Sequence, residues 1–287
     1  MKTLTHRLLF VFLGLISSVQ LVAAEVDALF PQMPGVVSYT YREDFAKDTP
    51  GTLDKIAALG ITDIEFSNLF GKTAREIRAM LDERGLACSS FGVSYSDLLN
   101  KTDEVAANAK TLGATFVRVA WIPDRQPFTL ELAELTASEF NRIGKQLREQ
   151  HGLTFCYHNH GFEFVEYGDG TLFDVLVAKT NPRDVSYELD ILWAFFPGVD
   201  PAALLERHGD RFKLMHLKDL KKGVQGNLSG TTPVENDVAL GTGQLDIPAI
   251  LKAAAKAGVQ HYYIEDESPR TATQVPQSIR YLHGLSK

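Results

Sequence analysis

The chain has 287 residues, of which 45% are hydrophobic and 23% are charged, and its formal net charge is −7 at pH 7. This composition is ordinary for a globular protein that buries one large core or two small ones. The negative charge and the lack of a long basic run argue against nucleic-acid binding, because phosphate recognition depends on clustered lysine and arginine.

The first 24 residues predict a secretory signal peptide. Lys2 and Arg7 precede an apolar stretch that begins at Leu8, and a run of small residues ends at Ala24. This order of basic, apolar and small residues is typical of a cleaved leader, and an uncleaved membrane anchor is the alternative. We therefore expect an exported, periplasmic protein with no stable membrane insertion after cleavage, whose folded domain comprises residues 25–287.

Eight short runs rich in β-branched and aromatic residues follow at intervals, and we expect each to form a strand. Segments with helical periodicity separate them, and two of these segments, residues 74–85 and 249–258, end in a glycine typical of a helix C-terminus. The expected strands are residues 35–39, 62–66, 86–91, 115–121, 153–158, 184–190, 212–217 and 261–265.

Strands that alternate with helices predict an α/β protein with a parallel sheet. Closure into a (β/α)₈ TIM barrel is the simplest arrangement of eight such units, and residues 25–287 have a suitable length. A doubly wound open sheet is the alternative, but TYREDFAKDTPG, after the first expected strand, lacks the glycine-rich fingerprint of that fold. We interpret Cys88 and Cys156 as free core residues, with one disulfide as the alternative.

Ionisable residues end several expected strands, at the face where barrel enzymes place their active sites. A single acid at such a place more often caps the next helix, but several carboxylates and imidazoles would meet at one mouth. Mixed oxygen and nitrogen donors without thiolates suit Mn²⁺, Mg²⁺, Co²⁺ or Zn²⁺ rather than a structural zinc. These strand-end residues are Glu65, His158, His160, Asp190, His216 and Glu265.

The longest loop, residues 220–242, follows the seventh expected strand and is rich in Gly, Asn, Ser and Thr. In a barrel it would lie on the catalytic face, where it could be a lid, a substrate loop or a tolerated insertion. Gly241 and Gly243 within it are a weak signal for phosphate binding.

Five segments together resemble the sugar isomerase/epimerase-like barrels of the xylose isomerase-like superfamily. The resemblance covers essentially all of the chain after residue 24 and is sharpest in the C-terminal half. It implies a TIM barrel that holds one divalent metal ion and acts on a carbohydrate, with Asp190, His216 and Glu265 as three of the metal ligands. The segments are YHNHGFEF (157–164), YELDILW (187–193), MHLKD (215–219), LGTGQLD (240–246) and YYIEDE (262–267).

The sequence departs from that family at the fourth ligand, a glutamate on the fifth strand. His158 falls near this position, and Glu163 lies five residues further on. We prefer Glu163 as the ligand of a hard ion such as Mn²⁺ or Mg²⁺, whereas His158 would suit a more azophilic metal. His158 and His160 would share one face of a strand, and the histidine left over is the expected base.

Other residues are expected to complete the site. Lys218 is a candidate for stabilising a developing oxyanion, with a surface lysine as the alternative. Tyr39, Glu65 and Trp121 are expected pocket residues at strand ends. Trp193 follows Asp190 closely and could stack on a sugar ring or pack in the core.

The resemblance implies a metal-dependent sugar isomerase or epimerase that removes a proton next to a carbonyl. The same proton abstraction permits β-elimination, so a keto-sugar lyase or hydratase is the alternative, and the departure at His158 favours it. A non-catalytic carbohydrate-binding barrel is a third hypothesis. Relatives that act on DNA are opposed by the acidic charge and the leader, and a homo-oligomer stays open.

Overall fold

The computed structural model describes residues 29–30, 32–122 and 127–285, so the expected leader lies outside the described residues. Eight parallel strands form a closed barrel, and each of the eight expected runs supplies one of them. The predicted TIM barrel is therefore confirmed, and the open-sheet alternative is wrong. The barrel strands are β1 (Gly35–Val37), β2 (Asp63–Phe66), β3 (Ala87–Gly92), β4 (Phe116–Val119), β5 (Thr154–His158), β8 (Val185–Asp190), β9 (Phe212–Leu217) and β12 (His261–Ile264).

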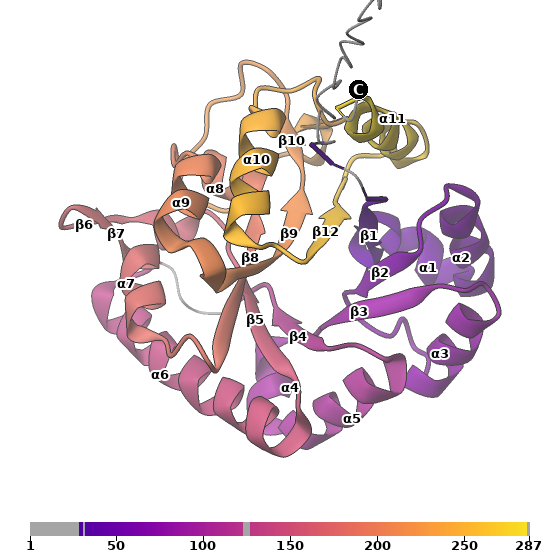
Figure 1. Cartoon of the computed structure of the whole chain (residues 1–287), viewed down its shortest axis with the longest axis horizontal. Helices are drawn as coiled ribbons and strands as arrows, with labels where there is room; N and C mark the ends of the chain where they lie inside the picture. Colours follow the sequence, from indigo (N-terminus) through magenta and orange to yellow (C-terminus); the bar gives the residue numbers. More distant parts are fainter. Residues whose placement is uncertain (1–28, 31, 123–126, 286–287) are drawn as a thin grey trace, which may run out of the picture.

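Helices surround the barrel and connect its strands (Figure 1). Local sequence sets their ends: Thr73 and Glu76 form a capping box at the start of α3, and Gly258 ends α10 with a φ of 76°. The helices are α1 (Arg42–Lys47), α2 (Thr49–Ala58), α3 (Ala74–Asp82), α4 (Tyr95–Asn100), α5 (Thr102–Leu112), α6 (Leu130–Gln146), α7 (Leu172–Lys179), α8 (Ile191–Phe195), α9 (Pro201–His208), α10 (Ile247–Ala257) and α11 (Thr271–Gly284).

Alternate residues of each strand enter two separate cores, because successive side chains point to opposite faces. The larger core lies between strands and helices and includes Phe155 and Met215, whereas their neighbours Cys156 and Leu214 belong to a small cluster of inward-facing residues. Cys88 and Cys156 are both buried and free, which confirms their interpretation as core residues. The inward-facing side of each strand is thus the side that carries residues toward the barrel mouth.

Two short hairpins, which we did not expect from the sequence, extend the barrel. β6 (Glu166–Tyr167) and β7 (Gly170–Thr171) form one that projects from the barrel edge (Figure 1). β10 (Asp219–Leu220) pairs with β11 (Asp237–Val238) and so brings the two ends of the long loop together. The middle of that loop is left to fold over the barrel mouth.

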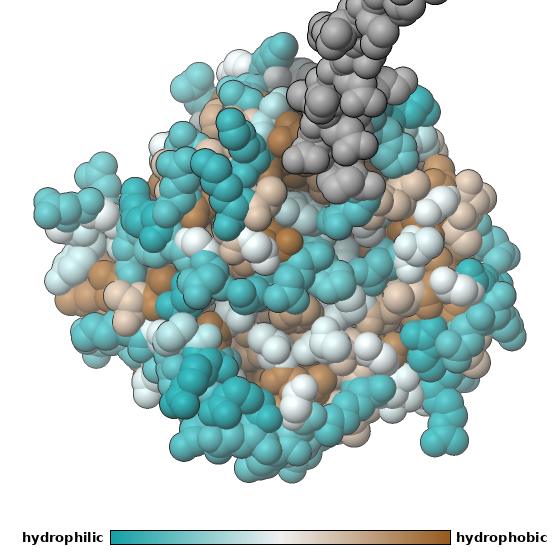
Figure 2. Space-filling model, in the orientation of Figure 1, coloured by the Kyte–Doolittle hydropathy of each residue, from teal (hydrophilic) through white to brown (hydrophobic). Residues whose placement is uncertain are grey.

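The surface is polar in the view of Figure 2, where hydrophobic residues form small patches between hydrophilic ones. In the part of the chain that the structure describes, no helix is long and apolar enough to cross a membrane.

Helix α6 packs so closely against the chain before β8 that one position admits only glycine. A Cβ atom on Gly144 would lie 2.0 Å from the carbonyl oxygen of Asp184. We expect Gly144→Ala to lower the free energy of unfolding by about 1–3 kcal/mol, because the helix must move away. Gly284→Ala is the matched control: nothing lies within 4 Å of its Cβ position in helix α11, so urea unfolding should show no loss. Equal stability of the two variants would contradict this packing argument.

Candidate metal centre

A cavity of about 590 Å³ opens at the carboxyl ends of the barrel strands. Its lining includes His158, His216 and Glu265, together with the predicted pocket residues Tyr39 and Trp121. Trp193, His160 and residues 230–232 of the long loop line it as well. Part of the long loop therefore does border the site, as a substrate loop would.

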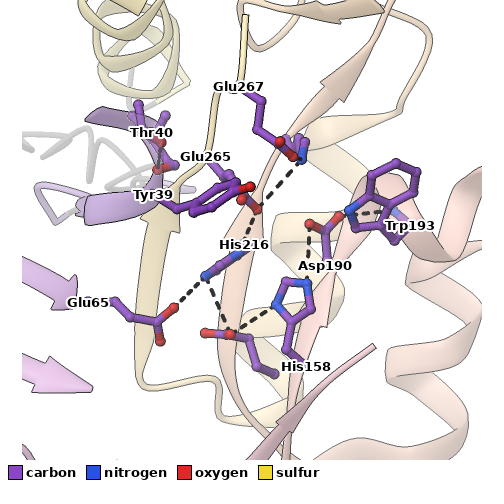
Figure 3. Close-up of polar contacts among 12 residues, drawn as sticks. Tyr39, Thr40, Glu65, His158, Asp190, Trp193, His216, Glu265 and Glu267 are labelled. Carbon is purple, nitrogen blue, oxygen red and sulfur yellow. Dashed lines mark hydrogen bonds and ion pairs between the residues drawn. The ribbon is translucent and has the colours of Figure 1, made fainter. Parts of the chain in front are cut away.

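Four side chains meet at this mouth, each from a different strand end (Figure 3). His158, Asp190, His216 and Glu265 each offer one donor atom, and these atoms lie within 4.8 Å of one another. His216 Nδ1 is 2.8 Å from Glu265 Oε2, and His158 Nε2 is 3.7 Å from Asp190 Oδ2. The structure thus brings together the three ligands that the family resemblance implied, with His158 as the fourth member.

Glu163, our preferred fourth ligand, is not part of this cluster. Its carboxylate accepts hydrogen bonds from the Tyr157 hydroxyl and from the backbone N–H of His160, at 3.0 and 3.1 Å for the two oxygens. Burial raises the pKa of Glu163 to about 7. Glu163 fixes the turn after β5, and our preference for it is corrected in favour of His158.

Asp190 has one carboxylate oxygen in use and one free. Its Oδ1 accepts from the backbone N–H of Trp193 at 2.9 Å and so caps helix α8, while the buried Oδ2 has no hydrogen-bond partner among the described residues. Asn159 bonds to both the backbone N–H and the carbonyl oxygen of Asp190, which ties β5 to β8. Burial raises the pKa of Asp190 to about 8, against the opposing effect of Lys218.

These residues fit a divalent metal ion. A buried carboxylate oxygen without a partner is costly, and a cation beside Asp190 Oδ2 would satisfy it. Burial lowers the pKa of His216, but Glu188 and Glu265 outweigh burial and raise it well above its ordinary value, so binding of an ion would release a proton from this ring. Two imidazoles and two carboxylates suit Zn²⁺, Co²⁺ or Mn²⁺ better than Mg²⁺.

Glu65 does not line the cavity, contrary to our expectation, and lies beneath the metal cluster. Its Oε1 accepts from His216 Nε2 at 2.9 Å and from Arg118 Nε at 3.0 Å, and its Oε2 accepts from Ser90 Oγ at 2.5 Å. Burial raises the pKa of Glu65, but Arg118 and His216 outweigh it and lower the pKa to about 2. Glu65 is therefore an ionised partner of His216.

Glu65, Glu188 and His216 form a second group with metal-ligand spacing. The Arg118 guanidinium already contacts both carboxylates there, with its Nε 3.3 Å from Glu188 Oε2. The Arg118 side chain thus supplies the positive charge at this second group. We assign a metal ion only to the group of His158, Asp190, His216 and Glu265.

His160 lies between two tryptophan rings on the cavity wall. Its ring centroid is 5.1 Å from that of Trp121, edge to face, and 5.9 Å from that of Trp193, nearly parallel. Burial lowers the pKa of His160 to about 3, and the buried Nδ1 has no partner among the described residues. The imidazole is therefore neutral and can accept a proton, although a pKa of about 3 makes it a weaker base than the near-neutral histidine that we expected.

Lys218 is buried among carboxylates rather than directed into the cavity. Its Nζ lies 2.5 Å from Glu267 Oε1, and 3.7 Å from both Glu265 Oε2 and Asp237 Oδ2. Burial lowers the pKa of Lys218, but these three acids outweigh it and raise it well above its ordinary value. The expected oxyanion role is therefore corrected: Lys218 is a fixed cation that orients Glu265.

Asp219 explains the glycine pair of the long loop. Its carboxylate accepts from the backbone N–H groups of Gly241 at 3.0 Å, Gly243 at 2.9 Å and Leu245 at 3.2 Å. A Cβ atom on Gly243 would lie 2.2 Å from Asp219 Oδ1. These amides already have an acceptor, so the glycines do not form a phosphate site.

Two buried residues of the site, Arg118 and Glu188, were missed by sequence reasoning. Both lie inside apolar strand runs, where a charged side chain is expensive unless it is paired. Glu188 precedes Asp190 by two residues, so the alternation of side chains along a strand places both on the inward face. The two-residue spacing from Asp190 was the sequence feature that could have identified Glu188 as a site residue.

Comparison with known proteins places the chain in a family. The family model described as xylose isomerase-like TIM barrel matches residues 53–285. The chain belongs to this family. The match confirms the family resemblance that the five motifs indicated.

Individual relatives add detail. The chain is similar to an inosose dehydratase of Geobacillus kaustophilus (strain HTA426), with 28% identity over 193 residues that cover 60% of this chain and 62% of the relative. A solved sugar phosphate isomerase/epimerase of Parabacteroides distasonis ATCC 8503 superposes with a TM-score of 0.71 at 23% identity, covering 89% of this chain and 98% of that one. The solved IOLI protein with a binding zinc atom has a TM-score of 0.69 at 14% identity and covers 88% and 96%.

Proposed function

We propose that this protein is a divalent-metal-dependent lyase that eliminates water, or another leaving group, from a cyclic keto-polyol or keto-sugar. The observation that carries the proposal is the buried cluster of His158, Asp190, His216 and Glu265, which opens on the cavity. Beside it lies His160, whose Nδ1 has no hydrogen-bond partner among the described residues. Similarity to an inosose dehydratase supports elimination over isomerisation, our first expectation from the sequence. The solved zinc-containing relative supports a metal ion in such a barrel.

Each part of the reaction has a group in the chain to perform it. The bound ion would polarise the carbonyl and hydroxyl oxygens of the substrate. His160 accepts the proton from the carbon next to the carbonyl, and the protonated ring then returns this proton to the hydroxyl on the following carbon, which leaves as water while the carbon–carbon double bond forms. Trp121 lines the cavity and is 42% exposed, so it offers a flat apolar surface to the ring of the substrate, whereas Trp193 is buried and packs against His160 and Lys218.

The test is a reaction in D₂O with the purified protein, loaded with Co²⁺, Zn²⁺ or Mn²⁺ or stripped with a chelator. A keto-inositol, a 3-keto-glucoside and an ordinary aldose serve as candidate substrates, followed by NMR. We expect loss of water or of the glycosidic group from a keto substrate by the loaded protein only. His160→Gln should stop both deuterium exchange and elimination while the metal content is unchanged.

The same spectra separate the competing functions. Exchange of deuterium without elimination would replace the lyase by an isomerase or epimerase. Binding of the keto substrates without either reaction would indicate a non-catalytic barrel.

A further inference from the structure

Each of the two histidines in the metal cluster has a carboxylate on its far side. His158 Nδ1 is hydrogen-bonded to Glu188 Oε2 at 3.0 Å, and His216 donates from Nε2 to the ionised Glu65 Oε1 at 2.9 Å. All four side chains are buried. The ring nitrogen that remains on each histidine is the one that faces the other cluster members, Asp190 for His158 and Glu265 for His216.

A carboxylate in this position fixes which nitrogen of the imidazole carries the proton. The ionised Glu188 carboxylate accepts from Nδ1–H, and the lone pair of His158 then lies on Nε2, the atom next to Asp190 Oδ2. The side chain can then bind a cation without first changing its tautomer or rotating its ring. Asp190 and Glu188 stand two residues apart on β8, so one strand supplies both the ligand and the partner of its neighbour.

Arg118 holds the two outer carboxylates in place. Its guanidinium contacts Glu65 and Glu188 from β4, in register with Gly92 on β3. A Cβ atom on Gly92 would lie 2.9 Å from Arg118 Cζ, so the neighbouring strand leaves room for this side chain. The outer carboxylates are therefore part of a packed layer rather than mobile side chains.

We propose that Glu188 is a positioning residue that makes His158 a metal ligand. Its hydrogen bond to Nδ1 holds the ring so that Nε2 faces Asp190 Oδ2. This inference rests on the metal-dependent function proposed above. It adds a residue that contacts a metal ligand but would not contact the ion. Glu188 does not touch the substrate.

The experiment measures metal affinity and not activity. Co²⁺ and Zn²⁺ dissociation constants are obtained by competition with a chromophoric chelator, and the absorption spectrum of the Co²⁺ protein reports its ligand geometry. Glu188→Met removes the acceptor and should weaken binding by about 10–100-fold with an altered Co²⁺ spectrum. Glu188→Gln keeps an oxygen acceptor for His158 and should lose less affinity than Glu188→Met.

The chain offers a matched control at the opposite end of the barrel. Asp63 Oδ2 accepts from His261 Nδ1 at 3.0 Å, the same distance as in the pair of Glu188 and His158, but far from the cavity lining. Asp63→Asn should leave affinity and spectrum unchanged. Wild-type affinity and an unchanged spectrum in folded Glu188→Met would overturn this inference alone. Failure of the wild-type protein to bind either ion would overturn the proposed function together with it.

Discussion

We expect the Asp190→Asn variant to fold normally and to lose about 10³-fold in kcat/KM, or about 4 kcal/mol of transition-state stabilisation. Asparagine keeps an oxygen that can accept from the backbone N–H of Trp193, so helix α8 should still begin at residue 191. It removes the negative charge at Oδ2, which has no hydrogen-bond partner among the described residues. The loss should appear in kinetics with saturating Co²⁺ or Zn²⁺ and in a weakened metal dissociation constant.

The pH dependence of stability is a second measurement that tests the Asp190→Asn variant. Burial raises the pKa of Asp190 to about 8, above its unfolded value of 3.8. The metal-free wild-type protein therefore loses stability as the pH rises from about 4 to 8, because folding then favours a protonated group. Metal-free Asp190→Asn lacks this loss and should be at least as stable at pH 8.

A matched control exists in Asp200, which caps helix α9 by accepting from the backbone N–H of Ala202 at 2.9 Å. Asp200→Asn makes the same chemical change at a cap away from the cavity. It should leave kcat/KM and metal affinity unchanged. Full activity of Asp190→Asn would remove Asp190 from the site.

The Arg118→Met variant should have the largest effect on stability, a loss of about 3–5 kcal/mol. Methionine fills much of the volume but leaves Glu65 and Glu188 buried without their cation. Urea unfolding of the metal-free proteins measures the loss. A triple variant that also replaces Glu65 and Glu188 by leucine should recover much of the stability, since no buried charge is left unpaired, and should bind metal poorly.

Lys101→Met is the control for this argument. Lys101 is paired with Asp97, and the two side chains are 58% and 49% exposed, so water screens this ion pair. Replacement of Lys101 should cost much less stability than replacement of Arg118. If the two variants lose similar free energies of unfolding, the large cost expected for Arg118→Met does not come from the burial of its carboxylate partners.

The barrel was predictable because each strand has its own local pattern. The eight apolar runs are short and separated by helical segments, so hydrophobic periodicity locates every strand, and the number of units with the length of the chain indicates closure. The two hairpins were missed because β6, β7, β10 and β11 have two residues each, too few for any pattern. Their pairing depends on where the barrel places the loops.

The site was predictable only where a ligand ends a strand. Asp190, His216 and Glu265 were found by position, but the choice between His158 and Glu163 required knowledge of the turn at Phe162–Phe164. Hard-ion chemistry favoured Glu163, whereas local bonds to Tyr157 and His160 withdraw its carboxylate from the mouth. Glu65 was misplaced for a related reason: a residue inside the barrel can lie beneath the cavity as easily as on its wall.

The shortest barrel strand, β1, defines where the folded barrel begins in the sequence. β1 has three residues and pairs with both β12 and β2, yet the family match begins at residue 53, after it. A fragment designed on the family boundary would expose the unpaired backbone of β2 and β12, two open edges that invite aggregation. It would also lose Val37 and Tyr39 from the cavity wall. Recombinant forms of this barrel should therefore begin well before Gly35.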